Sequence, residues 1–180
     1  MELGGQDVML VQTVKLAMVY IFHVEELLLF PIYIMRTNLI LIKYNGDKKA
    51  TLHLDNDAAH IHMGGKWHIP TNEQFKELLD EKNTVSTWLH DYCDSGVSGR
   101  LFRSRINNET LFIPANGFIS GHASYQNGLT CSLWTSSLDF SSVYNCTDFI
   151  GNKFNAYIST TCAYYVCMGI RGVFNTFWMK

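Results

Sequence analysis

The sequence predicts an α+β fold, because two short helical patterns precede a long region without helical periodicity. The helical patterns fall at residues 57–63 and 71–79, and short apolar segments separated by Gly, Asn and Ser follow Thr84. Helices that come before a run of strands are typical of α+β domains. The chain has 180 residues, of which 47% are hydrophobic and 17% charged, which suits one domain with a sizeable core.

The first helix is predicted over residues 57–63. Asp55 or Asp57 can cap its first turn, and Gly64 can adopt the left-handed conformation that ends a helix. Residues 66–70 follow as a short extended link, since a residue that precedes proline avoids the helical region.

The second helix begins with a capping box, in which Thr71 is the N-cap and Gln74 stands three residues later. Its buried stripe at helical spacing is Phe75, Leu78 and Leu79. Its exposed face carries Lys76, Glu77 and Asp80.

Short strands are predicted wherever apolar residues alternate or cluster between turn signals. These segments are residues 99–105, 111–114, 132–136, 154–158 and 170–174.

The first 41 residues have a different character and no clear role. Their apolar runs are interrupted by Lys15, by Glu25 and Glu26, and by Arg36, so none reaches the length of a membrane span. A signal peptide also fits poorly, because no small-residue cleavage site follows Val24. A buried strand or helix is favoured over a membrane role. We therefore divide the chain into an apolar segment at 1–41 and a folded domain at 42–180.

Charge and cysteine content exclude some functions and leave others open. A net charge of −2 and a pI near 6.4 give no reason to expect nucleic acid as a partner. The five cysteines form no C-x-x-C pair, so free thiols are favoured, while one or two disulfides stay open for an exported protein.

No metal, cofactor or catalytic centre is predicted. Four histidines cluster in sequence, but His60 and His62 would point about 200° apart on a helix and could not share a metal as an i,i+4 pair does. Helix capping explains Asp55 and Asp57 more simply than paired carboxylates do. Neither a phosphate-binding loop nor a nucleophile elbow occurs.

A series of sequence blocks in a fixed order resembles the family named for the Fibrobacter succinogenes major paralogous domain. The blocks span about residues 42–174 and are specific only together. They are residues 43–46 (KYNG), 54–59 (LDNDAA), 63–71 (MGGKWHIPT), 96–102 (GVSGRLF), 111–117 (LFIPANG), 133–137 (LWTSS) and 169–173 (GIRGV).

The resemblance implies a C-type-lectin-like fold, related to the formylglycine-generating-enzyme architecture but without its chemistry. Family members are typical of gut Bacteroidota and their phages, and some are variable proteins of diversity-generating retroelements. It implies core roles for Trp67 and Trp134, a helix start at Pro70 and Thr71, and a place for Arg171 in the closing strand.

One part of the family pattern is missing. Members carry an opening strand of the Gly-Leu-Pro-Ser-Gly type, which pairs with the C-terminal strand, and residues 1–41 contain no match to it. Either the apolar runs substitute for that strand, or the chain is a truncated or rearranged gene product.

The composition of residues 124–170 is also unusual. Glu, Lys, Gln, Met and Trp occur there only as Gln126, Trp134, Lys153 and Met168. Randomising asparagine codons at their adenines yields none of these five types. A β-rich region disfavours Glu and Lys in any case, so both explanations stay open.

We therefore predict a non-enzymatic binding protein with a variable ligand face at residues 140–166. Its partner would be a cell-surface protein or glycan, its place a virion or a cell surface, and its role phage attachment or bacterial adhesion. The contact residues are predicted from their polar or aromatic side chains between the sequence blocks. They are Phe140, Tyr144, Asn145, Thr147, Asn152, Asn155, Tyr164 and Tyr165.

Two alternatives remain: a structural module of a surface or virion assembly, and a formylglycine-type enzyme with a reactive cysteine pair. Calcium-dependent sugar binding is not predicted, because no proline stands in a Glu-Pro-Asn or Gln-Pro-Asp type loop.

Overall fold

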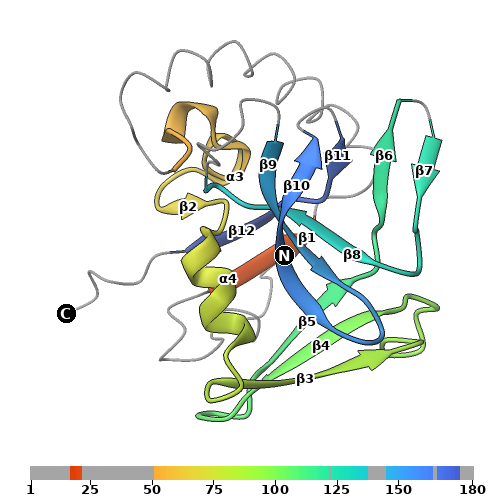
Figure 1. The fold of residues 1–180 in the computed structure, drawn as a ribbon. Coiled ribbons are helices and arrows are strands. Elements are labelled where there is room, and N and C mark those ends of the chain that lie inside the picture. Colours follow the sequence, from red (N-terminus) through yellow and green to blue (C-terminus); the bar gives the residue numbers. More distant parts are fainter. Residues whose placement is uncertain (1–16, 22–50, 122, 138–144, 164–165, 175–180) are drawn as a thin grey trace, which may run out of the picture.

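The fold is α+β, as the sequence predicts. The computed structural model describes residues 17–21, 51–121, 123–137, 145–163 and 166–174. Within them, two short helices and a one-turn 3₁₀ helix accompany four small sheets of three strands each, all paired antiparallel (Figure 1). The helices are η1 (Leu54–Asn56), α3 (Ala58–Met63) and α4 (Asn72–Leu79).

Two of the sheets are built from strands that follow one another in the chain. The first consists of β3 (Thr84–Leu89), β4 (Gly99–Ser104) and β5 (Thr110–Pro114), with β4 in the centre. The second consists of β8 (Cys131–Trp134), β9 (Asn145–Gly151) and β10 (Ala156–Ala163), with β9 in the centre.

The other two sheets join strands that are distant in sequence. One has β12 (Arg171–Phe174) between β1 (Ala17–Ile21) and β2 (Trp67–His68), and the other has β6 (Phe118–Ser120) between β7 (Ala123–Tyr125) and β11 (Cys167–Met168). The apolar N-terminal segment thus supplies a strand that pairs with the last strand of the domain.

Both predicted helices are present and are capped as the sequence indicates. Asp57 is the N-cap of α3, where its Oδ1 accepts a hydrogen bond from the His60 N–H at 3.0 Å, and Gly64 ends that helix with φ of 68°. Thr71 and Gln74 form the capping box of α4. Asp57 also accepts from the Ile69 N–H at 2.8 Å, which ties α3 to the chain that follows β2.

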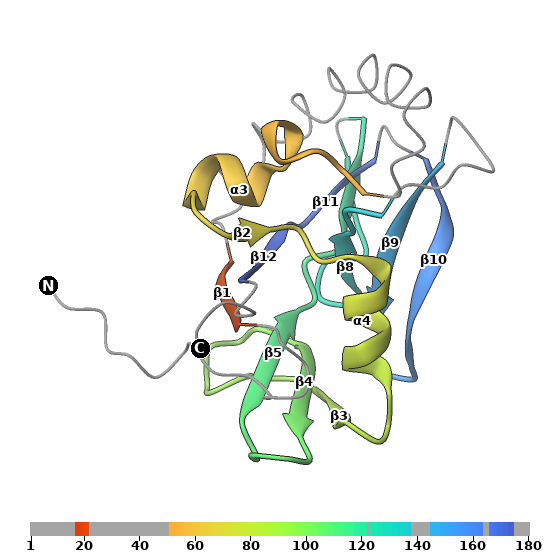
Figure 2. The same ribbon diagram turned by 90° about the vertical axis from the view of Figure 1, so that its left-hand side faces the viewer.

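The core consists of two clusters of buried side chains. In the larger one, α4 packs across the β8–β9–β10 sheet (Figure 2), and its buried members are Phe75, Leu78, Phe102, Leu111, Ile113, Cys131, Leu133, Phe149 and Val173. The smaller cluster lies under α3, with Ala58, Ala59, Ile69, Trp134, Met168 and Ile170. Trp134 is therefore a core residue, whereas Trp67 is half-buried and meets the Phe174 ring edge-on at 5.3 Å.

Four of the strand predictions match a strand of the structure, and the fifth is right only for its last three residues. The segments at 99–105 and 170–174 contain β4 and β12, and those at 111–114 and 132–136 overlap β5 and β8, which each begin one residue earlier. The segment predicted at 154–158 begins instead with a turn, and β10 starts only at Ala156. Five further strands were not predicted: β3, β6, β7, β9 and β11.

No helix in the described ranges has both the length and the apolar character needed to cross a membrane.

Candidate functional site

The predicted contact residues that the structure describes belong to the β9–β10 hairpin and to the connection between its strands. The other four, Phe140, Tyr144, Tyr164 and Tyr165, lie outside the described residues. Asn145 begins β9 opposite Ala163, and we call this end of the hairpin the loop end. Asn152 and Asn155 lie in the connection between the strands, which we call the turn end.

The two ends are too far apart for one small ligand to bridge. β9 has seven residues, Asn145 to Gly151, and a strand rises about 3.3 Å per residue, so the ends are separated by roughly 20 Å. The turn end reaches the β3–β4–β5 sheet at the bottom of Figure 1, while the loop end is at the top. Asn145 therefore cannot share one small-ligand site with Asn152 and Asn155.

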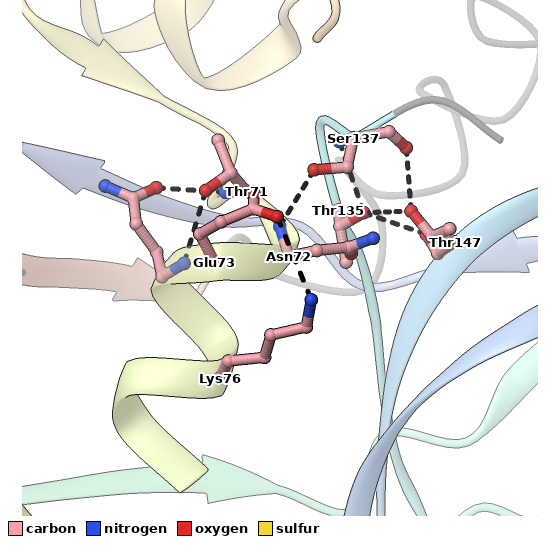
Figure 3. A network of polar contacts seen from close by, with 8 residues as sticks. Thr71, Asn72, Glu73, Lys76, Thr135, Ser137 and Thr147 are labelled. Carbon is pink, nitrogen blue, oxygen red and sulfur yellow. Dashed lines mark hydrogen bonds and ion pairs between the residues drawn. The ribbon is translucent and has the colours of Figure 1, made fainter. Parts of the chain in front are cut away.

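Thr147 is not an exposed contact residue, which corrects the prediction for it. Thr147 is only 3% exposed. Its hydroxyl donates a hydrogen bond to the Ser137 carbonyl at 2.7 Å and lies 2.5 Å from the Thr135 hydroxyl (Figure 3). The Thr135 hydroxyl in turn lies 3.1 Å from the Thr147 carbonyl. These bonds connect the chain just before residues 138–144 to the chain just after them.

The same cluster is fixed to the start of α4. The Asn72 N–H, one of the donors that a helix leaves free in its first turn, bonds to the Ser137 hydroxyl at 2.9 Å (Figure 3). The nearby ion pair between Lys76 and Glu73, at 3.9 Å and largely exposed, contributes little. Buried hydrogen bonds thus anchor both sides of the 138–144 segment to the helix and the sheet.

Thr147→Val is expected to lower the free energy of unfolding by about 1.5 kcal/mol. Valine keeps the shape of threonine but leaves the buried Ser137 carbonyl without its donor, while the Thr135 hydroxyl keeps only its bond to the Thr147 carbonyl. Urea unfolding measures the difference. Thr160→Val, at an exposed position of β10, is the matched control and should change stability little. Equal effects at the two threonines would contradict the role of this cluster.

The turn end has a compact, hydrogen-bonded backbone that displays an aromatic ring. The Asn152 Oδ1 accepts from the N–H groups of Phe154 (2.8 Å) and Asn155 (3.1 Å), and the Asn152 N–H donates to the Asn155 carbonyl at 2.8 Å. Phe154 is 82% exposed, and the Lys153 ammonium lies 4.8 Å from its ring centroid. A large aromatic side chain held so openly on a fixed turn is a candidate contact for a partner.

A groove of about 490 Å³ runs between this turn, β3, β4 and the end of α4. Its lining is mainly polar and includes Arg100, Phe154 and Asn155. The volume lies in the range of small-ligand sites. Its lining residues are Leu79, Glu81, Thr84, Val85, Ser86, Arg100, Phe102, Arg105, Phe154, Asn155 and Ala156.

Arg100 and Phe154 were absent from the predicted site. Arg100 falls within a sequence block that we interpreted as framework, and Phe154 was assigned to a strand. The pattern Asn-Lys-Phe-Asn at 152–155 could have revealed the turn, because an asparagine side chain often bonds to backbone N–H groups a few residues ahead.

Three of the five cysteines have side chains that the structure describes, and Cys146 and Cys162 lie opposite each other where β9 pairs with β10. Cys93, Cys131 and Cys167 are free thiols. Burial raises the pKa of the Cys131 thiol to about 11, and its Sγ donates to the Ile113 carbonyl at 3.1 Å. A thiol this deeply protonated is a poor nucleophile. Across the ranges that the structure covers, His, Cys, Asp and Glu side chains nowhere gather in a group of three that could hold a metal ion.

Comparison with protein-family models, with curated proteins and with solved structures gave no match in any of the three cases.

Proposed function

We propose that the chain is a non-enzymatic ligand- or receptor-binding protein with a C-type-lectin-like fold. Its binding surface is the loop end of the β9–β10 hairpin, and its partner is a protein or glycan on a cell surface. A phage would use this surface for attachment and a bacterium for adhesion. The observation that carries the proposal is the buried cluster of Thr135, Ser137 and Thr147, which fixes both sides of residues 138–144 to the scaffold.

Hydrogen bonds that fix the residues on both sides of a connecting segment suit a scaffold that displays a variable loop. Binding residues are found mostly on loops that a fixed framework positions, because a loop can change sequence without loss of the core. Ser137 contacts both Thr147 and the first turn of α4, so changes between residues 138 and 144 leave these bonds in place. The lectin-like topology is supported by the pairing of β1 with β12, since the family resemblance implies an opening strand beside the closing one.

Alanine at Tyr164 or Tyr165 is expected to weaken binding to the partner about tenfold, since aromatic anchors dominate many interfaces. The unfolding midpoint should stay unchanged. Binding can be measured on arrays of surface glycans and on whole cells of the source community. Tyr157→Ala, an exposed tyrosine near the turn end, is the control that should bind normally. If the Tyr164 and Tyr165 variants unfold, these residues belong to the core. If they fold and no target is found, a structural module becomes the better proposal.

Sequencing of this gene across many cells or virions tests the proposed diversification. We expect variation between about residues 130 and 170, while the codons around Trp67, Pro114 and Arg171 stay constant. Even variation along the whole gene, or none, would leave a fixed adhesin or a structural module.

A further inference from the structure

Arg100 is a buried cation without a carboxylate partner in the described part of the chain. Arg100 is 6% exposed, and its guanidinium group donates hydrogen bonds to the Ser86 hydroxyl at 2.8 Å and to the Asn152 carbonyl at 2.5 Å. Its Nε is buried and has no hydrogen-bond partner there. The ion pairs found among the described residues, His53 with Asp55 and Lys76 with Glu73, do not involve it.

Burial of the Arg100 guanidinium costs free energy unless an anion compensates its charge. Removing a charged group from water costs several kcal/mol, which neutral acceptors offset only in part. Burial lowers the pKa of Arg100 from its usual value, as expected for a desolvated cation, although a guanidinium keeps its proton in proteins. An uncompensated buried charge at the edge of an open groove indicates a ligand of opposite sign.

The rest of the groove supplies complementary chemistry. Arg105, whose Nε donates to the Glu81 carbonyl at 2.7 Å, adds a second, exposed guanidinium, and Glu81 is the one acidic residue of the lining. Ser86 and Asn155 offer a hydroxyl and a carboxamide, and the exposed ring of Phe154 stands at the rim.

We propose that this groove binds a carboxylate-bearing saccharide. The two guanidinium groups face the carboxylate, because charge-assisted bonds from arginine to carboxylate are among the strongest in proteins. Phe154 covers the apolar face of the sugar ring, and Ser86 and Asn155 bond to its hydroxyl groups. An acidic peptide side chain would use the arginines but has no ring of hydroxyl groups for the other two. The site goes beyond the proposed function, because it lies at the turn end of the hairpin.

The test is calorimetric titration of the full chain with trigalacturonate and with its fully methyl-esterified form. We expect the acid to bind and the ester, which lacks the charge, to show no binding. Arg105→Gln should weaken binding about tenfold, and Phe154→Ala about fivefold. Both residues are exposed, so these variants should fold. Arg103→Gln removes the same charge from an exposed position of β4 outside the groove and should bind as the unmodified protein does.

Three results would overturn the proposal: no binding of the acid, equal binding of the ester, or equal losses for Arg103→Gln and Arg105→Gln. Binding of a short Asp- and Glu-rich peptide in place of the saccharide would also overturn it. The Tyr164→Ala and Tyr165→Ala variants should bind trigalacturonate normally, so failure here is distinguishable from failure at the loop end.

Discussion

Phe149→Ala is expected to lower the free energy of unfolding by about 4 kcal/mol, because it removes a large ring from the centre of the core. Phe149 is 0% exposed and stacks on Phe75 of α4, with ring centroids 4.8 Å apart and 17° between the planes. It also meets Phe102 of β4 at 6.3 Å and 59°. One side chain of β9 therefore connects the helix to the neighbouring sheet, and alanine would leave a cavity where all three elements meet. Urea unfolding measures the loss.

Phe154→Ala is the matched control, since it deletes the same ring a few residues further along the same hairpin. Phe154 is 82% exposed, so the substitution should change stability by less than about 0.5 kcal/mol. Similar losses for the two variants would mean that the turn end packs against the core and is not open to a ligand.

The helices were predictable because the signals that start and stop them are local. Asp57 and Gly64 bond within their own helix, and Thr71 and Gln74 complete each other across a single turn. These hydrogen bonds depend on residues three or four positions apart, which a reader of the sequence can see directly.

β9 was missed because it is buried on both faces. Thr147, Asp148 and Phe149 are consecutive and all buried, so the strand shows no alternation of apolar and polar residues. Strand alternation is a signal only where one face meets water. Hydrogen bonds to Ser137 and Thr135 allow the buried threonine, and no local pattern could reveal such partners.

The separation between Asn145 and Asn152 was missed for a related reason. Closeness in sequence suggested one surface for residues 140–166, but an extended strand carries Asn145 and Asn152 to opposite ends of a sheet. Conversely, Arg100 reaches Asn152 across 52 positions of the chain. The groove is lined by residues from segments that are distant in sequence, so tertiary structure was required to find it.

Asp148, also in β9, makes stability depend on pH. It is 1% exposed and its Oδ1 has no hydrogen-bond partner among the described residues. Burial raises the pKa of Asp148 from 3.8 to about 6, and a hydrogen bond with Ser159 opposes this only in part. The folded state thus binds the proton more tightly than the unfolded state does. The contribution of protonated Asp148 to the stability of the folded state is fully present below the unfolded pKa of 3.8. This contribution is lost as pH rises through about 6.

Asp148→Asn is expected to raise the free energy of unfolding by about 2–3 kcal/mol at pH 8 and to change it little near pH 4. Asparagine has nearly the same shape but carries no charge, so the cost of a buried carboxylate disappears. Urea unfolding of both proteins between these pH values gives the difference curve, which should rise through the pKa of Asp148. Asp94→Asn removes an exposed carboxylate and should give a flat curve. A loss of stability at every pH would instead mean that the Asp148 carboxylate is held by a positive partner in the folded protein.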